Sequence, residues 1–300
     1  MNEQRCGFVA VVGPPNAGKS TLVNRLVGAK VSIVSPKVQT TRSRVMGIAI
    51  VEETAAQVIF IDTPGIFEPK RRLDRAMVRA AWSGAADADV TVVMIDAHRG
   101  EDDDSRRIVA RLRESSAKAC LVLNKIDLVP RHKLLGLAAA LTASGVFDPV
   151  FMISAATGDG VGDLMKHLVG NLPLGPWHFP EDQISDMPQR LLAAEVTREQ
   201  IFLQLHQELP YAATVDTDMW REQDDGAVRI DQTIYVVRDS QKAIVLGKGG
   251  ARIKAIGEQA RRELEILLER RVHLFLHVKT RESWQEDRQH YRNMGLDFDS

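Results

Sequence analysis

Short apolar runs alternate with helix-periodic stretches in the first half of the chain. The apolar runs lie at residues 6–12, 58–61, 90–95, 120–123 and 150–153. They are rich in branched side chains and bounded by turn-forming or polar residues, which is typical of strands buried on both faces. Helical stretches, at 18–28, 71–82, 104–114 and 133–143, lie between most of them. This order predicts an α/β domain whose mostly parallel sheet carries helices on both faces and binds ligands at the carboxyl ends of its strands.

The alternation stops near Leu172, and a different pattern follows. Residues 171–188 carry four prolines and little periodicity, as expected of a linker. After it we expect a helix at 189–209, an acidic stretch around 216–225, a strand at 228–237, two helices separated by a glycine-rich loop, and a strand at 272–280. The sequence therefore predicts a first domain at 5–172, a linker at 173–188, a smaller α+β domain at 189–282 and a C-terminal tail at 283–300.

Composition narrows the functional classes. The chain has 300 residues, 44% of them hydrophobic, and 39 basic against 40 acidic residues give a net charge of −1. A nucleic-acid site must therefore be a local patch. The two cysteines lie beside apolar runs and are expected to be buried core thiols. With no apolar run of membrane-spanning length and no signal-peptide pattern at residues 1–5, we expect an intracellular protein.

The chemistry-bearing motif nearest the N-terminus is a phosphate-binding loop. The segment from Gly13 to Ser20 matches GxxxxGK[ST] between a predicted strand and a predicted helix. Its backbone N–H groups and the helix N-terminus would cradle phosphates. Lys19 would reach the β and γ phosphates, and Ser20 would bind Mg²⁺. The nucleotide contacts expected here come from Gly13, Pro14, Pro15, Asn16, Ala17, Gly18, Lys19, Ser20 and Thr21.

Three further motifs follow the ends of later predicted strands. Asp62, Thr63, Pro64 and Gly65 form DTPG, whose carboxylate can hold the Mg²⁺ shell. Asn124, Lys125 and Asp127 belong to NKID, in which Asp127 can accept two N–H bonds from guanine and so reject adenine. Ser154 and Ala155 would offer a backbone N–H to guanine O6. Their joint order predicts a guanine-nucleotide site.

These four motifs resemble those of the P-loop GTPases. The resemblance implies that a threonine of the first switch loop completes the Mg²⁺ sphere, and Thr41 matches it, with Thr40 and Ser43 as competitors. It also implies catalytic roles for Lys19, Thr41 and Asn16. Ile66 stands where many members carry a water-orienting glutamine, so we expect slow intrinsic turnover. Related bacterial GTPases use an asparagine at the position of Asn16 to hold K⁺, a role that we carry over as a hypothesis.

A second glycine motif lies in the smaller domain. The GxxG loop, Gly247–Gly250, sits between two predicted helices, as in the loops with which KH domains clamp single-stranded nucleic acid. The segment 247–279 carries eight Lys or Arg and four acidic residues, an excess of +4. The residues expected to bind RNA are Gly247, Lys248, Gly249, Gly250, Arg252 and Lys254.

The motif order, the linker with FPEDQISD and the GxxG segment together resemble the Era family, bacterial ribosome-assembly GTPases. The resemblance implies a P-loop GTPase domain joined to a type II KH domain. It implies a GTP-gated, Mg²⁺-dependent switch that grips the 3′ end of small-subunit ribosomal RNA and assists assembly of the small ribosomal subunit. A cytoplasmic monomer is expected, with peripheral association with the inner membrane left open.

Two other functions stay open at this point. In one, the KH-like domain is only structural and the chain regulates a protein partner. In the other, the chain is an RNA-directed GTPase of the same group that acts in tRNA modification or on the large subunit. The GxxG module and its basic excess favour the RNA switch over both.

Overall fold

The computed structural model describes residues 4–299, except for the side chains of Gln285, Gln289 and Asn293. Residues 1–3, on which the expectation of no signal peptide partly rests, lie outside this range. The chain forms two compact units. The described part of the first unit comprises residues 4–34, 41–186 and 294–299, and the second comprises Ser35–Thr40 and Met187–Asn293.

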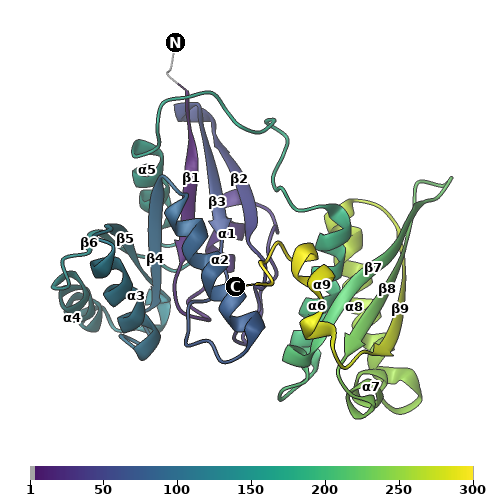
Figure 1. The fold of residues 1–300 in the computed structure, drawn as a ribbon. Helices are drawn as coiled ribbons and strands as arrows, with labels where there is room; N and C mark the ends of the chain where they lie inside the picture. The colour runs from purple at the N-terminus through teal and green to yellow at the C-terminus, as the bar shows by residue number, and fades with distance from the viewer. Residues whose placement is uncertain (1–3, 300) are drawn as a thin grey trace. The chain divides into compact units, whose positions relative to one another are not determined.

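The first unit is built on a six-stranded sheet with the spatial order β2-β3-β1-β4-β5-β6 (Figure 1). Its strands are β1 (Arg5–Val12), β2 (Val45–Val51), β3 (Ala56–Asp62), β4 (Val90–Asp96), β5 (Ala119–Asn124) and β6 (Phe147–Met152). All neighbours pair in parallel except β2, which runs antiparallel to β3 at the sheet edge. The predicted α/β fold with a mostly parallel sheet is confirmed.

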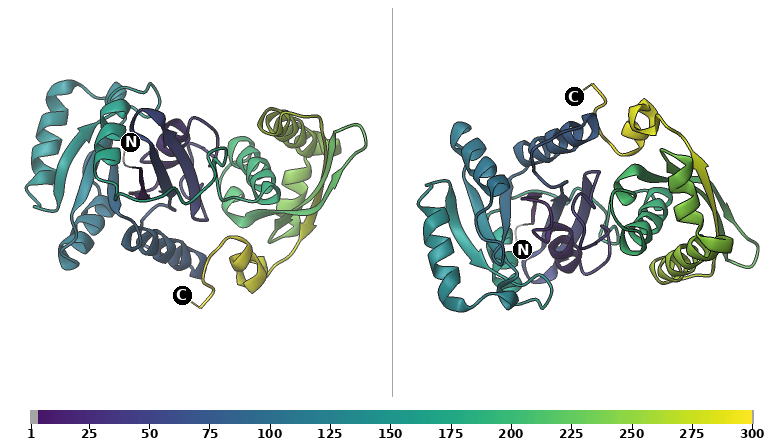
Figure 2. Two further views of the ribbon diagram at one scale, coloured as in Figure 1. Left: turned by 90° about the horizontal axis from the view of Figure 1, so that it is seen from above. Right: turned by 90° about the horizontal axis from the view of Figure 1, so that it is seen from below.

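Helices cover both faces of this sheet (Figure 2). They are α1 (Lys19–Val27), α2 (Arg72–Ala86), α3 (Asp103–Glu114), α4 (Arg131–Thr142) and α5 (Val161–Gly170). Side chains of α2, α3 and α4, such as Ala81, Ile108 and Leu134, share one core with the sheet. The apolar runs of β3 and β5 are buried along their whole length, which explains why they contain no alternating polar positions.

The segment predicted as a linker is ordered against the first unit. Gln57 of β3 receives hydrogen bonds from the backbone N–H groups of His178 and Phe179, and its own amide donates to the Phe179 carbonyl. Further along, the N–H of Ile48 in β2 donates to Ile184. Because this segment is rich in proline, its sequence shows no helix or strand periodicity. These hydrogen bonds nevertheless fix the segment along the sheet edge.

The second unit has a three-stranded sheet, β7-β8-β9, with helices packed on it (Figure 1). Its elements are α6 (Gln189–Gln204), β7 (Ala213–Glu222), β8 (Val228–Val236), α7 (Asp239–Leu246), α8 (Ala251–Leu268), β9 (Val272–Thr280) and α9 (Arg288–Asn293). β7 and β8 are antiparallel, whereas β8 and β9 are parallel. This is the expected α+β domain.

Two details of the second unit differ from the sequence expectation. Most of the acidic stretch lies in a strand, β7, in which Val215 faces the core and Asp216, on the opposite face, carries the charge, and Asp224 and Asp225 follow in the turn. The helix that begins at residue 189 ends at Gln204 rather than at residue 209. The segment that follows includes Gln207, which adopts a positive φ of 57° that an α-helix does not allow.

Within residues 4–299, no helix is both long and apolar enough to cross a membrane. Both cysteines are buried, as predicted. Burial raises the pKa of the Cys120 thiol to about 12, so this group stays protonated and behaves as part of the core.

Candidate guanine-nucleotide site and RNA groove

The phosphate-binding loop joins β1 to α1 and is held by close backbone packing. A Cβ atom at Gly13 would collide with the Met94 carbonyl, and one at Gly18 would collide with the side-chain amide of Asn124. Gly18 also has a φ of 97°, which disfavours other residues. The glycines of the motif are therefore required by their surroundings, and they leave the first turn of α1 open toward a phosphate.

Lys19 lies at the base of this loop and is only 6% exposed. Its Nζ donates to the carbonyls of Gly13, at 3.1 Å, and Pro14, at 2.9 Å. Burial lowers the pKa of Lys19 to about 8, and the nearby Asp62 carboxylate opposes this shift. The ammonium is thus fixed within the loop that would surround the phosphates.

Three oxygen-bearing side chains converge beside Lys19. The Ser20 hydroxyl donates to Oδ2 of Asp62 at 2.7 Å, and the Thr41 hydroxyl lies 2.9 Å from Ser20 Oγ. The structure thus brings Thr41, rather than its competitor Thr40, next to Ser20. The Thr40 hydroxyl contacts Ser35 and the Lys37 carbonyl instead.

This trio fits a magnesium ion. Asp62 is fully buried, and its Oδ1 has no hydrogen-bond partner among the described residues. Burial raises the pKa of this carboxyl, whereas the Ser20 hydrogen bond and the Lys19 charge lower it. Mg²⁺ prefers oxygen ligands and combines one or two carboxylates with substrate phosphates and water, which matches one carboxylate and two hydroxyls beside a phosphate loop. Ser20, Thr41 and Asp62 could therefore hold it.

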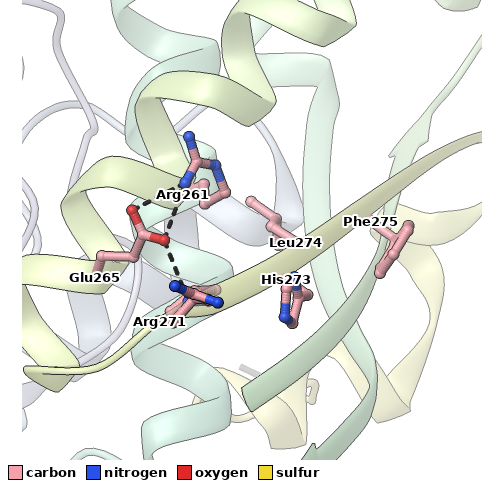
Figure 3. A pocket seen from close by; sticks show the side chains of 7 residues that line it. Arg261, Glu265, Arg271, His273, Leu274 and Phe275 are labelled. Atoms are coloured by element: carbon pink, nitrogen blue, oxygen red, sulfur yellow. Dashed lines mark hydrogen bonds and ion pairs between the residues drawn. The ribbon is translucent and has the colours of Figure 1, made fainter. Parts of the chain in front are cut away.

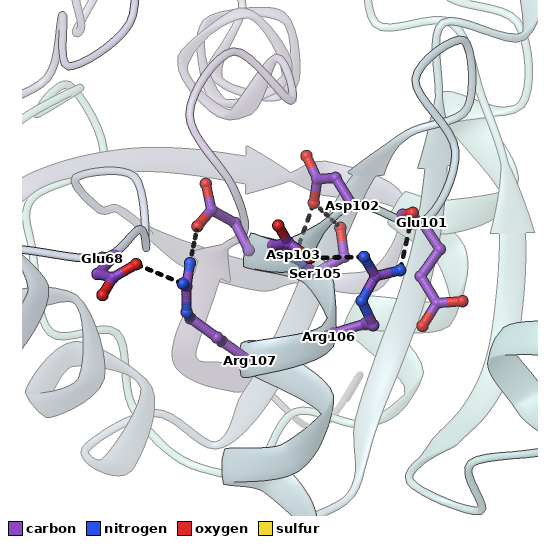
Figure 4. Close-up of polar contacts among 8 residues, drawn as sticks. Glu68, Glu101, Asp102, Asp103, Ser105, Arg106 and Arg107 are labelled. Carbon is purple, nitrogen blue, oxygen red and sulfur yellow. Dashed lines mark hydrogen bonds and ion pairs between the residues drawn. The ribbon is translucent and has the colours of Figure 1, made fainter.

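The residue that follows the DTPG motif, Ile66, has an apolar side chain. Ile66 is buried in the core of the first unit, and its backbone N–H donates to Gly13 at 3.0 Å. Glu68, further along the loop, pairs with Arg107 of α3 at 2.6 Å (Figure 4). The loop is thus tied both to the phosphate loop and to α3.

The guanine-recognition motifs are connected through Asn124 at the end of β5. Its Nδ2 donates to the carbonyl of Ala17 at 2.8 Å, and its Oδ1 accepts from the N–H of Ala155 at 2.9 Å. One buried side chain therefore fixes the phosphate loop and the loop after β6 relative to each other. The Ala155 N–H donates to Asn124 and the Ser154 N–H donates to the Asp159 carbonyl at 2.9 Å, so both amides that the sequence offered to guanine O6 are engaged within the protein.

The remaining residues of this site lie at its rim. Asp127 is exposed, so a base would have to cover its carboxylate before the expected pair of hydrogen bonds could form away from water. Lys125 adopts a positive φ of 66°, and its Nζ contacts Oδ2 of Asp96 at 2.6 Å. This ion pair would hold the lysine stem beside a base.

Sequence reasoning missed several residues that position the site. Asp96 ends β4 and orients Lys125, and its place at the carboxyl end of a buried strand was an available signal. Arg25 of α1 donates from Nε to the Ala155 carbonyl at 2.5 Å and so supports the loop after β6. Arg25 follows no motif, and only the fold brings it to this loop.

In the second unit, the GxxG loop connects α7 to α8. Gly247, Gly249 and Gly250 all have positive φ values, of 71°, 59° and 78°. A Cβ at Gly247 would collide with Arg252, whereas the positions of Gly249 and Gly250 open into free space. Lys248, Arg252 and Lys254 are exposed around the loop and have no ion-pair partner within residues 4–299.

A groove of about 650 Å³ runs beside this loop between α8 and β9, lined by Ile253, Lys254, Gly257, Glu258, Arg261, Leu274, Phe275 and Leu276. Gly257 lets the two elements approach, because a Cβ there would lie 3.3 Å from the Leu276 side chain. A second pocket continues it along β9 and adds Arg271 and His273 (Figure 3). An apolar floor with cationic walls suits bases and phosphates together.

The basic patch, defined as the Lys and Arg residues of 247–279, is partly neutralised. Arg261 pairs with Glu265, Arg262 with Glu258, and Arg270 with Glu222. Among the described residues, five of the eight cations of this patch lack an ion pair, and three of them, Lys248, Arg252 and Lys254, lie at the GxxG loop and the start of α8. The predicted RNA-binding residues Gly247, Lys248, Gly249, Gly250, Arg252 and Lys254 form one contiguous loop and helix N-terminus.

Comparison with known proteins decides the family. A family model described as "50S ribosome-binding GTPase" matches residues 8–125, and a "KH domain" model matches residues 208–285. The chain is 60% identical over 294 residues to GTPase Era of Agrobacterium fabrum, which covers 98% of this chain and 92% of that protein. The chain belongs to the Era family of GTPases. GTPase Era of Brucella suis is 57% identical to this chain, and the alignment covers 99% of this chain and 94% of that protein.

Solved structures of Era share the whole fold. An Era complex with MgGDPNP and nucleotides 1506–1542 of 16S ribosomal RNA has a TM-score of 0.92 and 39% identity, covering 97% of this chain and 99% of that one. A substituted Aquifex aeolicus Era bound to GDP and AlF4⁻ gives the same TM-score, identity and coverage. The predicted P-loop GTPase and KH domains of the Era family are thereby confirmed.

Proposed function

We propose that the chain hydrolyses GTP to GDP and phosphate, and that the bound nucleotide controls how its KH domain grips the 3′ end of 16S ribosomal RNA during maturation of the small ribosomal subunit. The observation that carries the GTPase half is the convergence of Ser20, Thr41 and Asp62 beside Lys19. The RNA half rests on the apolar groove beside the GxxG loop.

The chain's own residues define the hydrolytic step. Lys19 and the loop backbone hold the β and γ phosphates, while Ser20, Thr41 and Asp62 would hold Mg²⁺, which supplies positive charge to the phosphate oxygens. A water oxygen attacks the γ-phosphorus, the bond to the bridging oxygen breaks, and GDP leaves with that electron pair, while the proton that the water loses passes to the released phosphate. With Ile66 buried, no side chain at that position orients the water, so intrinsic turnover is slow.

Asn16 is the remaining catalytic candidate. It lies in the phosphate loop with a positive φ of 63°, part-way exposed beside the phosphate cradle. Its side-chain oxygen would help to hold K⁺ near the transferring phosphate, where positive charge stabilises the transition state. This role predicts faster turnover in KCl than in NaCl, and equal rates in the two salts would refute it.

Guanine selectivity follows from the rim residues. Asp127 would accept the N1 and N2 hydrogens of guanine, and adenine cannot supply that pair. Lys125 would cover one face of the base. The loop after β6 is held in place by Asn124, Ser154 and Ala155. This side of the base-binding site is therefore formed before a nucleotide binds.

The groove between α8 and β9 predicts that the second unit binds single-stranded RNA. The GxxG backbone approaches the sugar-phosphate chain, Lys248, Arg252 and Lys254 contact phosphates, and bases enter the apolar floor. The choice of the small subunit rests on the solved Era complex that contains 16S ribosomal RNA. We further propose that the protein is a cytoplasmic monomer that can associate peripherally with the inner membrane.

Action on the large subunit is the second candidate, because the family model that matches the first domain is described as binding the 50S ribosome. That model covers only residues 8–125 and leaves out the KH domain. The small subunit is favoured because the Era protein whose solved complex contains 16S ribosomal RNA matches 97% of this chain, KH domain included.

The decisive experiment titrates a labelled oligonucleotide that copies the 3′ end of 16S ribosomal RNA, with a non-hydrolysable GTP analogue, with GDP and without nucleotide. Tighter binding with the analogue supports the gated switch. Equal binding in all three states refutes the gating, and preference for a 3′ end of large-subunit RNA would favour the second candidate.

The structure supplies a matched pair of variants for this titration. Gly249→Asp places a carboxylate in the GxxG loop without a steric clash, since aspartate tolerates positive φ. It should weaken RNA binding by about tenfold or more through charge repulsion with phosphates. Gly226→Asp, in the turn between β7 and β8, has a φ of 80° and equally open surroundings, and it should leave RNA binding unchanged.

A further inference from the structure

The last turn of α1 carries an arginine that reaches the loop after β6, residues 153–160. Arg25 Nε donates to the Ala155 carbonyl at 2.5 Å, and its Nη2 donates to the Ala156 carbonyl. One planar guanidinium thus holds two successive peptide groups, although Ala155 lies 130 positions further along the chain. Helix α1 begins at Lys19 of the phosphate-binding loop, so the same helix contacts both parts of the nucleotide site.

The loop is shaped around this side chain. Gly158 adopts a φ of 97°, and a Cβ atom there would lie 2.9 Å from Arg25 Nη1. Another residue at this position would therefore be strained and would displace the guanidinium. The Gly158 N–H donates back to the Ser154 carbonyl at 2.8 Å, which closes the loop into a turn.

Most backbone amides of this turn already have partners within the protein. The engaged N–H groups are those of Ser154, Ala155, Thr157 and Gly158. The N–H of Ala156 donates to no group within residues 4–299, and Ala156 is exposed. The turn therefore leaves one amide for a ligand, and it is neither of the two that the sequence offered to guanine O6.

Arg25 fixes the direction of this amide. The Ala155 carbonyl and the Ala156 N–H belong to one planar trans peptide group, in which they point in opposite directions. Because the guanidinium holds that carbonyl, the N–H is directed away from Arg25. The second bond, to the Ala156 carbonyl, restrains the next peptide group as well. A donor that is ordered before binding loses less conformational freedom when its ligand arrives.

The turn also lies next to the base-reading motif. Asn124, which accepts from the Ala155 N–H, is the first residue of NKID. In guanine, O6 is attached to the carbon beside N1, the nitrogen whose hydrogen Asp127 would accept. A group that donates to O6 must therefore stand close to this motif, as the turn does.

We propose that Arg25 is a positioning residue for guanine recognition: it holds the Ala155–Ala156 peptide so that the Ala156 N–H donates to guanine O6. The inference rests on the proposed function, because it assigns a supporting role in that same nucleotide site. It follows that α1 helps to select the base as well as to bind the phosphates.

The test measures the Kd of three nucleoside diphosphates for the full-length Arg25→Gln protein and the wild type. GDP is compared with inosine diphosphate, which keeps O6 but lacks the N2 amino group, and with 6-thioguanosine diphosphate, in which sulfur replaces O6. Sulfur is a weak hydrogen-bond acceptor. Loss of the O6 hydrogen bond should raise the Kd of GDP and of inosine diphosphate by about three- to tenfold. The Kd of the thio compound should change by less than about twofold.

Two further variants serve as controls. Arg113→Gln removes an exposed arginine of α3 whose Nε donates to the Ser144 carbonyl at 3.1 Å, and it should leave all three Kd values unchanged. Arg25→Lys keeps a cationic donor that can reach one carbonyl, so it should show the same pattern with a smaller loss. If thermal unfolding shows that Arg25→Gln is not folded, Arg25→Lys carries the test.

An unchanged Kd for GDP in folded Arg25→Gln would overturn the inference. An equal rise of the Kd for all three compounds would also overturn it, since a merely structural role does not distinguish oxygen from sulfur at this position. The same holds for an equal loss in Arg113→Gln, which would indicate a general effect of removing a surface arginine. Wild-type protein that binds ADP as tightly as GDP would instead refute the guanine site of the proposed function.

Discussion

In the nucleotide site of the first unit, polar side chains bind one another, whereas the cations around the GxxG loop of the second unit point into solvent. Asn124 connects two motif loops, and Ser20 connects Thr41 with Asp62. Lys248, Arg252 and Lys254 have no ion-pair partner among the described residues. Transfer of a phosphoryl group requires fixed geometry, whereas an RNA strand is held largely by the charge of its phosphates.

This contrast means that substitutions in the two sites should act differently. A change in the nucleotide site removes hydrogen bonds from a buried network and should affect both stability and affinity. A change at the RNA groove should alter affinity with little cost to the fold. The four predictions below probe the two sites in order of decreasing effect.

The largest effect is expected for Asp127→Asn. Two hydrogen bonds to a carboxylate contribute about 3 kcal/mol or more together, so GTP affinity should fall by about 100-fold or more. Xanthosine nucleotides should bind better, because asparagine can donate to the xanthine oxygen. Competition binding against labelled GDP measures both changes. Asp163→Asn, an exposed carboxylate of α5, is the control, and unchanged GTP affinity in Asp127→Asn would refute the base-reading role.

Asn124→Ala should reduce both stability and GDP affinity. It leaves the Ala17 carbonyl and the Ala155 N–H unpaired in a buried place, which costs about 2–3 kcal/mol of unfolding free energy. Denaturant unfolding measures the first effect and calorimetry the second, for which we expect about a tenfold loss. Asn171→Ala removes an exposed amide that donates to the His167 carbonyl at 2.8 Å and should change neither. Full stability in Asn124→Ala would contradict the connecting role.

The sequence predicted those parts of the molecule in which local pattern and function coincide. The strands that end in DTPG and NKID were found because continuous apolar runs preceded polar motifs. β2 and β7 were missed for opposite reasons: β2 contains Gly47 and has no motif after it, and the charges of β7 obscured its alternation. Their pairing partners lie elsewhere in the chain, so only the fold identifies them as strands.

The sequence also could not predict residues that support a site from elsewhere in the chain. Arg25 carries no motif, and it donates to a carbonyl that only tertiary structure brings near. A count of charges along 247–279 includes the glutamates that pair with Arg261 and Arg262, but it cannot show that Arg270 pairs with Glu222 outside the segment.

A smaller effect concerns pH and GDP affinity. Lys19 has a pKa of about 8 in the folded protein, below its ordinary value of 10.5. Its ammonium is therefore lost as pH rises through 8, and GDP affinity should fall by up to about tenfold between pH 7 and pH 9. Between pH 7 and pH 9, Lys19 keeps its proton more fully in the unfolded chain than in the folded protein. The titration of this group therefore increases the stability of the nucleotide-free protein as pH rises. Unfolding cannot then explain the loss. Constant affinity across this range would refute the assignment.

The smallest effect is expected at the RNA groove. Glu258→Gln frees Arg262 from its 2.6 Å ion pair and removes a negative charge from the groove lining. Exposed pairs contribute about 0.2–1 kcal/mol, so RNA affinity should rise by about two- to fivefold. The salt dependence of binding should steepen by about one released counterion, since an additional cation meets the phosphates. The control is Glu114→Gln, which makes the same charge change at the Arg111–Glu114 pair of α3 in the first unit. Equal affinity gains in both variants would indicate that overall charge controls RNA binding, whereas a gain confined to Glu258→Gln places the contact in the groove.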